Sequence, residues 1–207
     1  LFLTGEKPEV NPIVAEQLRA WGHDDFTGYV IWACERALDR GILPHTNIGA
    51  VSETDLARLR EVTASQGLML ESSSERLMQT VHAGSPTKHP AHRPATIEAA
   101  GRLRIPFTTG ILVGIGESLQ DRIDALEAIA ASHRRHGHVQ EVIVQNFLPK
   151  DGTSMHLWPP CDHDEYLQAI ALARLILPAD IHLQAPPNLS DDFGVLLDDP
   201  AVEGCPD

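Results

Sequence analysis

Three carboxylates stand where apolar segments of the sequence end, and each could bind a polar ligand. Glu6 follows Gly5 after a short apolar start, Glu71 follows the apolar residues 68–70, and Glu117 ends a glycine-rich run that contains Gly110 and Gly114. A carboxylate forms charge-assisted hydrogen bonds with an amine, and it can accept from both hydroxyls of a ribose. Structural interpretations stay open: a glycine turn after the first apolar segment, and favourable placement of Glu117 beside a helix N-terminus.

Carboxamides follow two further apolar segments. The run Val142 to Val144 changes abruptly to Gln145, Asn146 and Phe147. A carboxamide presents both a donor and an acceptor, and an aromatic ring can stack on a flat partner. Together these side chains favour a heteroaromatic ligand over a phosphate. Two more carboxamides, Gln184 and Asn188, flank the prolines of a later segment.

The histidines and cysteines contribute one candidate. His45, close to Asn47 at the end of an apolar segment, is kept as a catalytic or substrate-binding group, because imidazole titrates near neutral pH. The other histidines fall at an expected helix end or in loops. Cys34, Cys161 and Cys205 are more than 40 residues apart, so their spacing predicts neither a disulfide framework nor a local metal site.

Short apolar segments that alternate with amphipathic helices must position these side chains. Near-continuous apolar strands separated by helices predict an α/β fold with a parallel sheet, either doubly wound or a (β/α) barrel. In both architectures, ligands bind at the carboxyl ends of the strands. Ser118 and Asp121 predict a capped helix over residues 118–136 that Gly137 ends. The expected strands cover residues 42–51, 68–71, 107–114, 139–147 and 181–184, with a stub at 1–3.

Composition excludes several classes of protein. The chain has 207 residues, of which 43% are hydrophobic, and a formal net charge of -13. A globular chain of this charge repels phosphate backbones, so we expect no nucleic-acid partner. No apolar run reaches the roughly 18 residues of a membrane span, so we expect no membrane partner either. Six carboxylates and no basic residue follow from Asp191, which predicts a loosely packed acidic tail. The first residue is Leu1 rather than Met, so we expect a front end that precedes it.

Six segments in order resemble one family. They read GEKPE at 5–9, LPHTN at 43–47, GLMLE at 67–71, PFTTGILVGIGE at 106–117, QEVIVQNF at 140–147 and QAPPNL at 184–189. On these segments, the chain resembles the radical S-adenosylmethionine enzymes, and within them the 7,8-didemethyl-8-hydroxy-5-deazariboflavin synthase family of coenzyme F420 biosynthesis.

The resemblance assigns roles to the candidate residues. It implies that Gly5 and Glu6 hold the methionyl amine of S-adenosylmethionine, and that Glu71 binds its ribose. Gly110 to Glu117 would support the nucleoside, and adenine would lie along Val144 to Phe147. The residues on the substrate side would be His45, Asn47, Gln184 and Asn188.

The resemblance also implies a partial enzyme. The family has a Cys-x3-Cys-x2-Cys loop that ligates a 4Fe-4S cluster, and this sequence contains no such loop. We therefore expect a partial (β/α) barrel of the TIM type over residues 1–197, without its first and last units, and a disordered tail over 198–207. This chain alone should be inactive and should not assemble the cluster.

For the intact enzyme, the resemblance implies a cytoplasmic lyase that closes the deazaflavin ring of a small-molecule substrate. That substrate is a 4-hydroxybenzyl, ribityl-aminouracil adduct that comes from a partner synthase, fused or separate. Two alternatives remain open. The chain could be another radical S-adenosylmethionine barrel, such as the partner synthase or a biotin- or menaquinone-pathway relative, or it could be a non-catalytic remnant.

Overall fold

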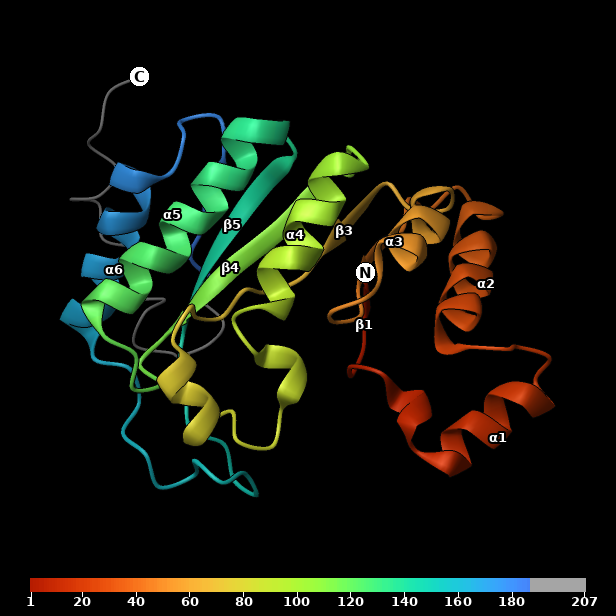
Figure 1. The fold of residues 1–207 in the computed structure, drawn as a ribbon, viewed down its shortest axis with the longest axis horizontal. Helices are drawn as coiled ribbons and strands as arrows, with labels where there is room; N and C mark the ends of the chain where they lie inside the picture. The colour runs from red at the N-terminus through yellow and green to blue at the C-terminus, as the bar shows by residue number, and fades with distance from the viewer. Residues whose placement is uncertain (187–207) are drawn as a thin grey trace.

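The computed structural model describes residues 1–186 and shows one sheet of six parallel strands (Figure 1). The strand order is β1-β2-β3-β4-β5-β6, so each strand pairs with the next one along the chain. A doubly wound sheet reverses its strand order part-way, whereas a barrel does not. The sheet is therefore of the barrel type. The strands are β1 (Phe2–Leu3), β2 (His45–Asn47), β3 (Ser65–Gly67), β4 (Phe107–Val113), β5 (Val139–Asn146) and β6 (His182–Gln184).

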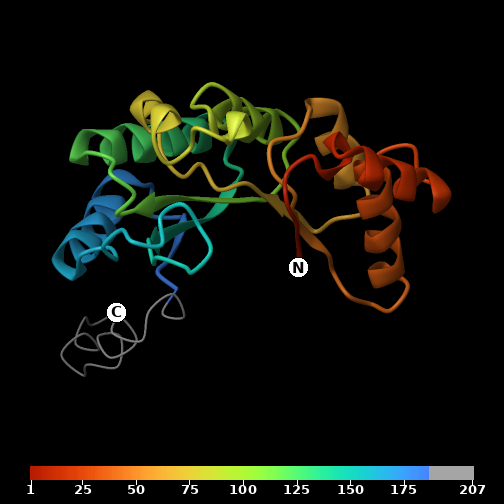
Figure 2. The ribbon, with the colours of Figure 1, turned by 90° about the horizontal axis from the view of Figure 1, so that it is seen from below.

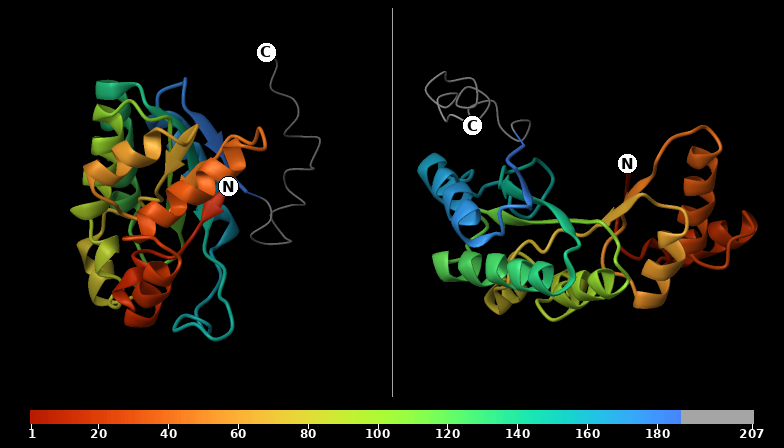
Figure 3. Two further views of the ribbon diagram at one scale, coloured as in Figure 1. Left: turned by 90° about the vertical axis from the view of Figure 1, so that its right-hand side faces the viewer. Right: turned by 90° about the horizontal axis from the view of Figure 1, so that it is seen from above.

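The helices wrap one side of this curved sheet (Figure 2 and Figure 3). They are α1 (Pro12–Ala20), α2 (Phe26–Leu38), α3 (Glu53–Arg60), α4 (His92–Arg102), α5 (Leu119–His136) and α6 (His163–Ile176), with 3-10 turns η1 (Pro8–Val10), η2 (Glu75–Gln79) and η3 (Pro86–Lys88). The predicted helix over 118–136 is confirmed. Ser118 and Asp121 form its capping box, and Gly137 ends it with φ 63°.

Two predicted strands are shorter or less regular than the sequence indicates. The expected strand over 42–51 is regular only at His45–Asn47. Residues 68–71 follow β3 rather than forming a strand of their own, although the backbone N–H of Glu71 still donates to the Gly110 carbonyl at 3.0 Å. The reason is local, because Glu71 has φ 67°, in the left-handed region that interrupts a regular ladder.

The core lies between the sheet and the helices. Phe107, Ile111 and Val113 of β4 are buried in one cluster that includes residues of α4, α5 and α6. Since side chains alternate along a strand, Thr108 and Gly110 point to the opposite face. We call that opposite, concave face the inner face. It corresponds to the interior of a closed barrel.

Two further observations complete the fold. Among the residues that the structure describes, no helix is long and apolar enough to cross a membrane. Asn188 and the expected tail over 198–207 lie outside the described residues.

Candidate functional site

The loops at the carboxyl ends of the strands carry most of the predicted ligand-binding residues. These loops lie at the lower edge of the sheet in Figure 1, with η1, η2 and η3 among them. Glu6 follows β1, Glu71 follows β3, and Glu117 follows β4. All three predicted carboxylates therefore lie at the same edge, as ligand binding at this end of a parallel sheet requires.

A buried arginine connects two of these carboxylates. Arg93, with 3% of its side chain exposed, forms an ion pair with Glu6 and donates to the Met69 carbonyl oxygen. Its Nη1 also lies 3.8 Å from Oε1 of Glu71, and Lys88 Nζ lies 3.3 Å from that same oxygen. We call Glu6, Glu71, Lys88 and Arg93 the open network. Its two acids and two bases balance in charge.

The open network retains unused hydrogen-bonding atoms. Within residues 1–186, Oε2 of Glu6, Oε2 of Glu71 and Nε of Arg93 are buried without a partner. A buried polar atom without a partner costs about 1–3 kcal/mol, and more when it is charged. The left-handed backbone of Glu71, at φ 67°, adds strain of a kind that concentrates at ligand sites. A bound ligand with amine or hydroxyl donors would satisfy both free carboxylate oxygens.

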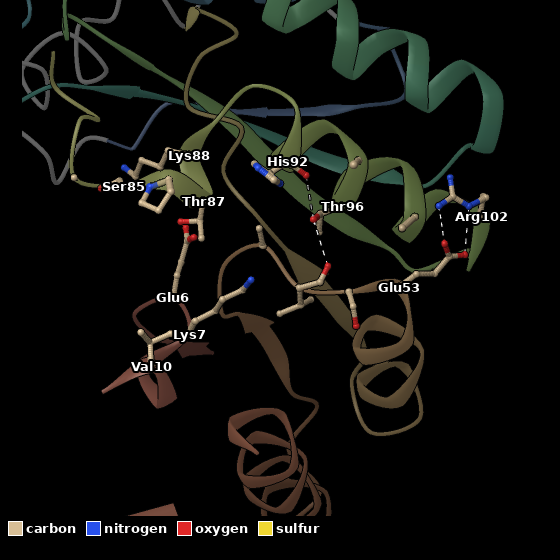
Figure 4. Close-up of a pocket in the computed structure, with 17 residues that line it drawn as sticks. Glu6, Lys7, Val10, Glu53, Ser85, Thr87, Lys88, His92, Thr96 and Arg102 are labelled. Atoms are coloured by element: carbon tan, nitrogen blue, oxygen red, sulfur yellow. Dashed lines mark hydrogen bonds and ion pairs between the residues drawn. The ribbon is translucent and has the colours of Figure 1, made fainter. Parts of the chain in front are cut away.

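A cavity of about 1010 Å³ opens beside this network (Figure 4). Glu6, Lys7 and Lys88 form part of its polar wall, and His92, Thr96 and Arg102 of α4 also line it. At the far end, Arg102 Nη2 pairs with Glu53 Oε2 at 2.7 Å. Of the open network, Glu6 and Lys88 line this cavity, whereas Glu71 and Arg93 lie behind its wall.

Glycines make room for some of these side chains. Gly49 has φ 88°, and a Cβ at this position would collide with the side chain of Glu6. A Cβ at Gly110 would collide with the Ile143 carbonyl oxygen and with Met69. Gly5 has no atom within 4 Å of the place where its Cβ would be, so no protein contact in the structure requires a glycine there.

Glu117 has a different environment. It accepts from the backbone N–H groups of Gly114 at 3.0 Å and Ile115 at 2.9 Å, and from Arg122 Nε at 2.7 Å. Arg122 also pairs with Glu165 of α6. We call Glu117, Arg122 and Glu165 the closed network. Because both oxygens of Glu117 have protein partners, this geometry favours a role in holding the glycine-rich loop.

The end of β5 offers a free carboxamide. Asn146 is 3% exposed, and neither of its amide atoms has a partner within residues 1–186. Val144 is buried and its carbonyl accepts from the Tyr166 hydroxyl at 2.8 Å, whereas Gln145 is half-buried. The backbone N–H of Phe147 donates to Val113 at 2.8 Å. By strand alternation, Asn146 shares its face with the core residues Val142 and Val144, so a base edge would use this donor and acceptor only by reaching the helix side of the strand end.

The inner face carries three other predicted residues. His45, Asn47 and Gln184 alternate with outward-facing neighbours, so they share this face. His45 Nδ1 lies 2.7 Å from Ser65 Oγ, and burial lowers the pKa of the imidazole. His45 pairs with Ser65, six residues before Glu71, which is about 20 Å along a strand. The structure therefore places His45 at the amino ends of the strands, away from the open network.

The sequence alone did not identify Arg93 and Lys88 as site residues. Both residues precede Pro94, where the sequence predicts that the next helix begins, and they fall in a loop with glycine and proline residues. In the structure, α4 begins at His92 instead. A usable signal exists, because these are basic residues between a buried acid and a helix start in a chain of net charge -13. A carboxylate next to a buried strand needs such a partner.

The cysteines in the described part of the chain do not fit an iron–sulfur cluster. Cys34, a residue of α2, is fully buried, and Cys161 is buried beside Gly114. Burial raises the pKa of both thiols to about 11, whereas cluster ligation needs thiolates that converge on one point. Residues 1–186 contain no group of three His, Cys, Asp or Glu side chains that could hold a metal ion. Cys205 lies outside the described residues.

Known proteins resemble this chain in sequence and in fold, although no protein-family model matches it. A 7,8-didemethyl-8-hydroxy-5-deazariboflavin synthase from Methanosphaerula palustris is 49% identical over 197 residues, covering 95% of this chain and 59% of the relative. This chain is a relative of the deazariboflavin synthases. The family predicted from the six sequence segments is confirmed.

A longer relative supports the same family, and a solved structure supports the same fold. The FO synthase of Mycobacterium tuberculosis is 47% identical over 197 residues, which cover 91% of this chain and 23% of that synthase. Methylornithine synthase has a similar structure, with a TM-score of 0.68 at 19% identity, over 95% of this chain and 54% of that enzyme. The predicted partial barrel is confirmed. The chain spans about three fifths or less of the curated synthases that it matches.

Proposed function

We propose that this chain forms the S-adenosylmethionine-binding part of an enzyme that makes the deazaflavin chromophore of coenzyme F420. The observation that carries the proposal is the pair of free carboxylate oxygens in the open network, on Glu6 and Glu71. The names of relatives at 47% and 49% identity support this reaction. The hydrogen-bonding capacity of the free carboxylate oxygens supports the choice of ligand.

The described residues fit S-adenosylmethionine. Oε2 of Glu6 would accept from the methionyl ammonium, and Oε2 of Glu71 would accept from the ribose hydroxyls. The free amide of Asn146 would bind the edge of adenine, beside Phe147. When bound, S-adenosylmethionine supplies the group that removes hydrogen from the substrate. The chain's own part is to bind, to orient and to exclude water.

The substrate and the partner follow from the same family. The reaction would close the ring of a 4-hydroxybenzyl, ribityl-aminouracil adduct by oxidation, with loss of ammonia. A second synthase would supply this adduct. The matched stretch makes up 23% of the mycobacterial synthase but 59% of the archaeal one, which leaves room for a fused partner in the longer protein. No step is assigned to a 4Fe-4S cluster, because the described residues provide no ligands for one.

Titration calorimetry on the protein that carries this chain tests the ligand. S-adenosylmethionine should bind, and Glu71→Gln should weaken that binding. Glu75→Gln is the matched control, because Glu75 is an exposed acid four residues further along the same loop. Unchanged affinity in Glu71→Gln, together with a lower unfolding temperature, would make Glu71 a structural acid.

Product analysis tests the reaction against its alternatives. The adduct should give the deazaflavin chromophore, whereas tyrosine plus the aminouracil should give nothing. The reverse result would identify the partner synthase. Binding of S-adenosylmethionine without turnover of either substrate would support another radical S-adenosylmethionine barrel. Absence of both binding and turnover would support a non-catalytic remnant.

A further inference from the structure

The inner face of the sheet changes in chemistry from the carboxyl ends of the strands to their amino ends. The charged open network lies at the carboxyl ends. One layer below it, Gly110, Ile143 and Gln184 are paired neighbours on β4, β5 and β6, and Met69 lies over Gly110. This middle layer is small and apolar except for one carboxamide. It suits a flat ring with a polar edge.

The layer below is polar right across the sheet. Thr108 of β4 pairs with Glu141 of β5, which pairs with His182 of β6. Gly67 of β3 pairs with Thr108, and Asn47 lies beside Gly67, one residue beyond the pair of Thr46 and Gln66. We call Asn47, Thr108, Glu141 and His182 the floor row. It lies about four residues, or about 13 Å along the strands, below Glu71.

Such a row is unusual inside a barrel, where bulky branched apolar side chains normally fill the layers. The floor row instead presents a carboxamide, a hydroxyl, a carboxylate and an imidazole. Within residues 1–186, no basic side chain forms an ion pair with Glu141; the hydroxyl of Thr108 lies 3.5 Å from its Oε2. Glu141 is half-buried and His182 is exposed on this face of the open sheet, so a ligand can reach the carboxylate. In this row it has one weak protein donor.

We propose that the floor row binds a polyhydroxylated chain, the ribityl group of the substrate. The inference rests on the proposed function and extends it, because it fixes the direction in which the substrate lies. The hydroxyls donate to Glu141 and accept from Asn47 and His182. The ring occupies the apolar middle layer, with its edge at Gln184. The benzyl end then lies under the open network, where S-adenosylmethionine would bind.

Two adjacent threonines allow a matched test. Thr108 and Thr109 follow each other on β4 and point to opposite faces. The protein that carries this chain would be titrated with the ribityl adduct and with an analogue in which methyl replaces ribityl. We expect Glu141→Leu to weaken binding of the adduct by tenfold or more, and Thr108→Val by a few-fold. Binding of the methyl analogue should not change in either variant.

A control variant on the opposite face of β4 accompanies this test, and two results would contradict the inference. Thr109→Val should leave the affinity for both ligands unchanged, and unfolding temperatures would identify a variant that does not fold. The inference is wrong if the floor-row variants weaken both ligands equally or neither, while the wild type still converts the adduct. If the wild type neither binds nor converts the adduct, the proposed function fails, and this inference fails with it.

Discussion

The open and closed networks use the same residue types at the same edge of the sheet, yet their hydrogen bonds are distributed differently. In the closed network, Glu117 has partners on both oxygens, two of them backbone N–H groups. In the open network, Glu6 and Glu71 each keep one buried oxygen without a partner in the described chain. A carboxylate at a strand end is therefore not in itself a ligand site. The unused oxygens of Glu6 and Glu71 are what the proposed binding role rests on, whereas Glu117 has none.

The largest expected effect comes from breaking the closed network. Arg122→Met would leave Glu117, whose side chain is 2% exposed, as a buried charge without its cation. Losing one partner of a buried pair typically costs about 3–5 kcal/mol. We expect the free energy of unfolding to fall by about that amount in urea titrations.

Two variants check this result. Arg134→Met changes an exposed arginine of the same helix, and its free energy of unfolding should stay within about 0.5 kcal/mol of the wild type. Adding Glu117→Gln to Arg122→Met should recover part of the loss, because the buried charge is then removed. A loss below about 1 kcal/mol in Arg122→Met would mean that the closed network does not hold the loop.

The next largest expected effect is on ligand affinity, which should depend on the open network but not on the closed network. Glu71→Gln should lower the affinity for S-adenosylmethionine by about 10- to 100-fold, equivalent to about 1.5–3 kcal/mol for hydrogen bonds to a charged group. Glu117→Gln should leave the affinity nearly unchanged and lower the free energy of unfolding instead. Calorimetry and urea titration on both variants would show this crossed pattern. If both variants lose affinity equally, the distinction between the networks is wrong.

The sequence was sufficient to predict the order of elements and the edge at which the carboxylates gather. Apolar segments and caps such as Ser118 are local signals, and parallel strands bring their carboxyl ends to one edge. The sequence offered Glu117 a structural role beside a helix N-terminus but did not decide between that role and ligand binding, because both Glu71 and Glu117 follow an apolar strand. The two acids differ in where their arginine partners lie. Arg122 follows Glu117 within the first turn of α5, whereas Arg93 lies on α4, 22 residues after Glu71. The position of His45 along the inner face could not be predicted either, because it depends on the pairing register of the strands.

The smallest expected effect concerns His82, a histidine close to charged residues of the open network. His82 is buried, Nε2 has no partner in the described chain, and the charges facing it are those of Lys88, Glu71 and Arg93. Burial, and then the charge of Lys88, lower the pKa of His82 below its usual value. The unfolded chain therefore takes up this proton first as the pH falls below about 6.5, and the folded state loses stability there. Between pH 7.5 and pH 5.5, the unfolding temperature of the wild type should fall further than that of His82→Gln. Parallel decreases in the two proteins would show that the pKa of His82 is not lowered in the folded state.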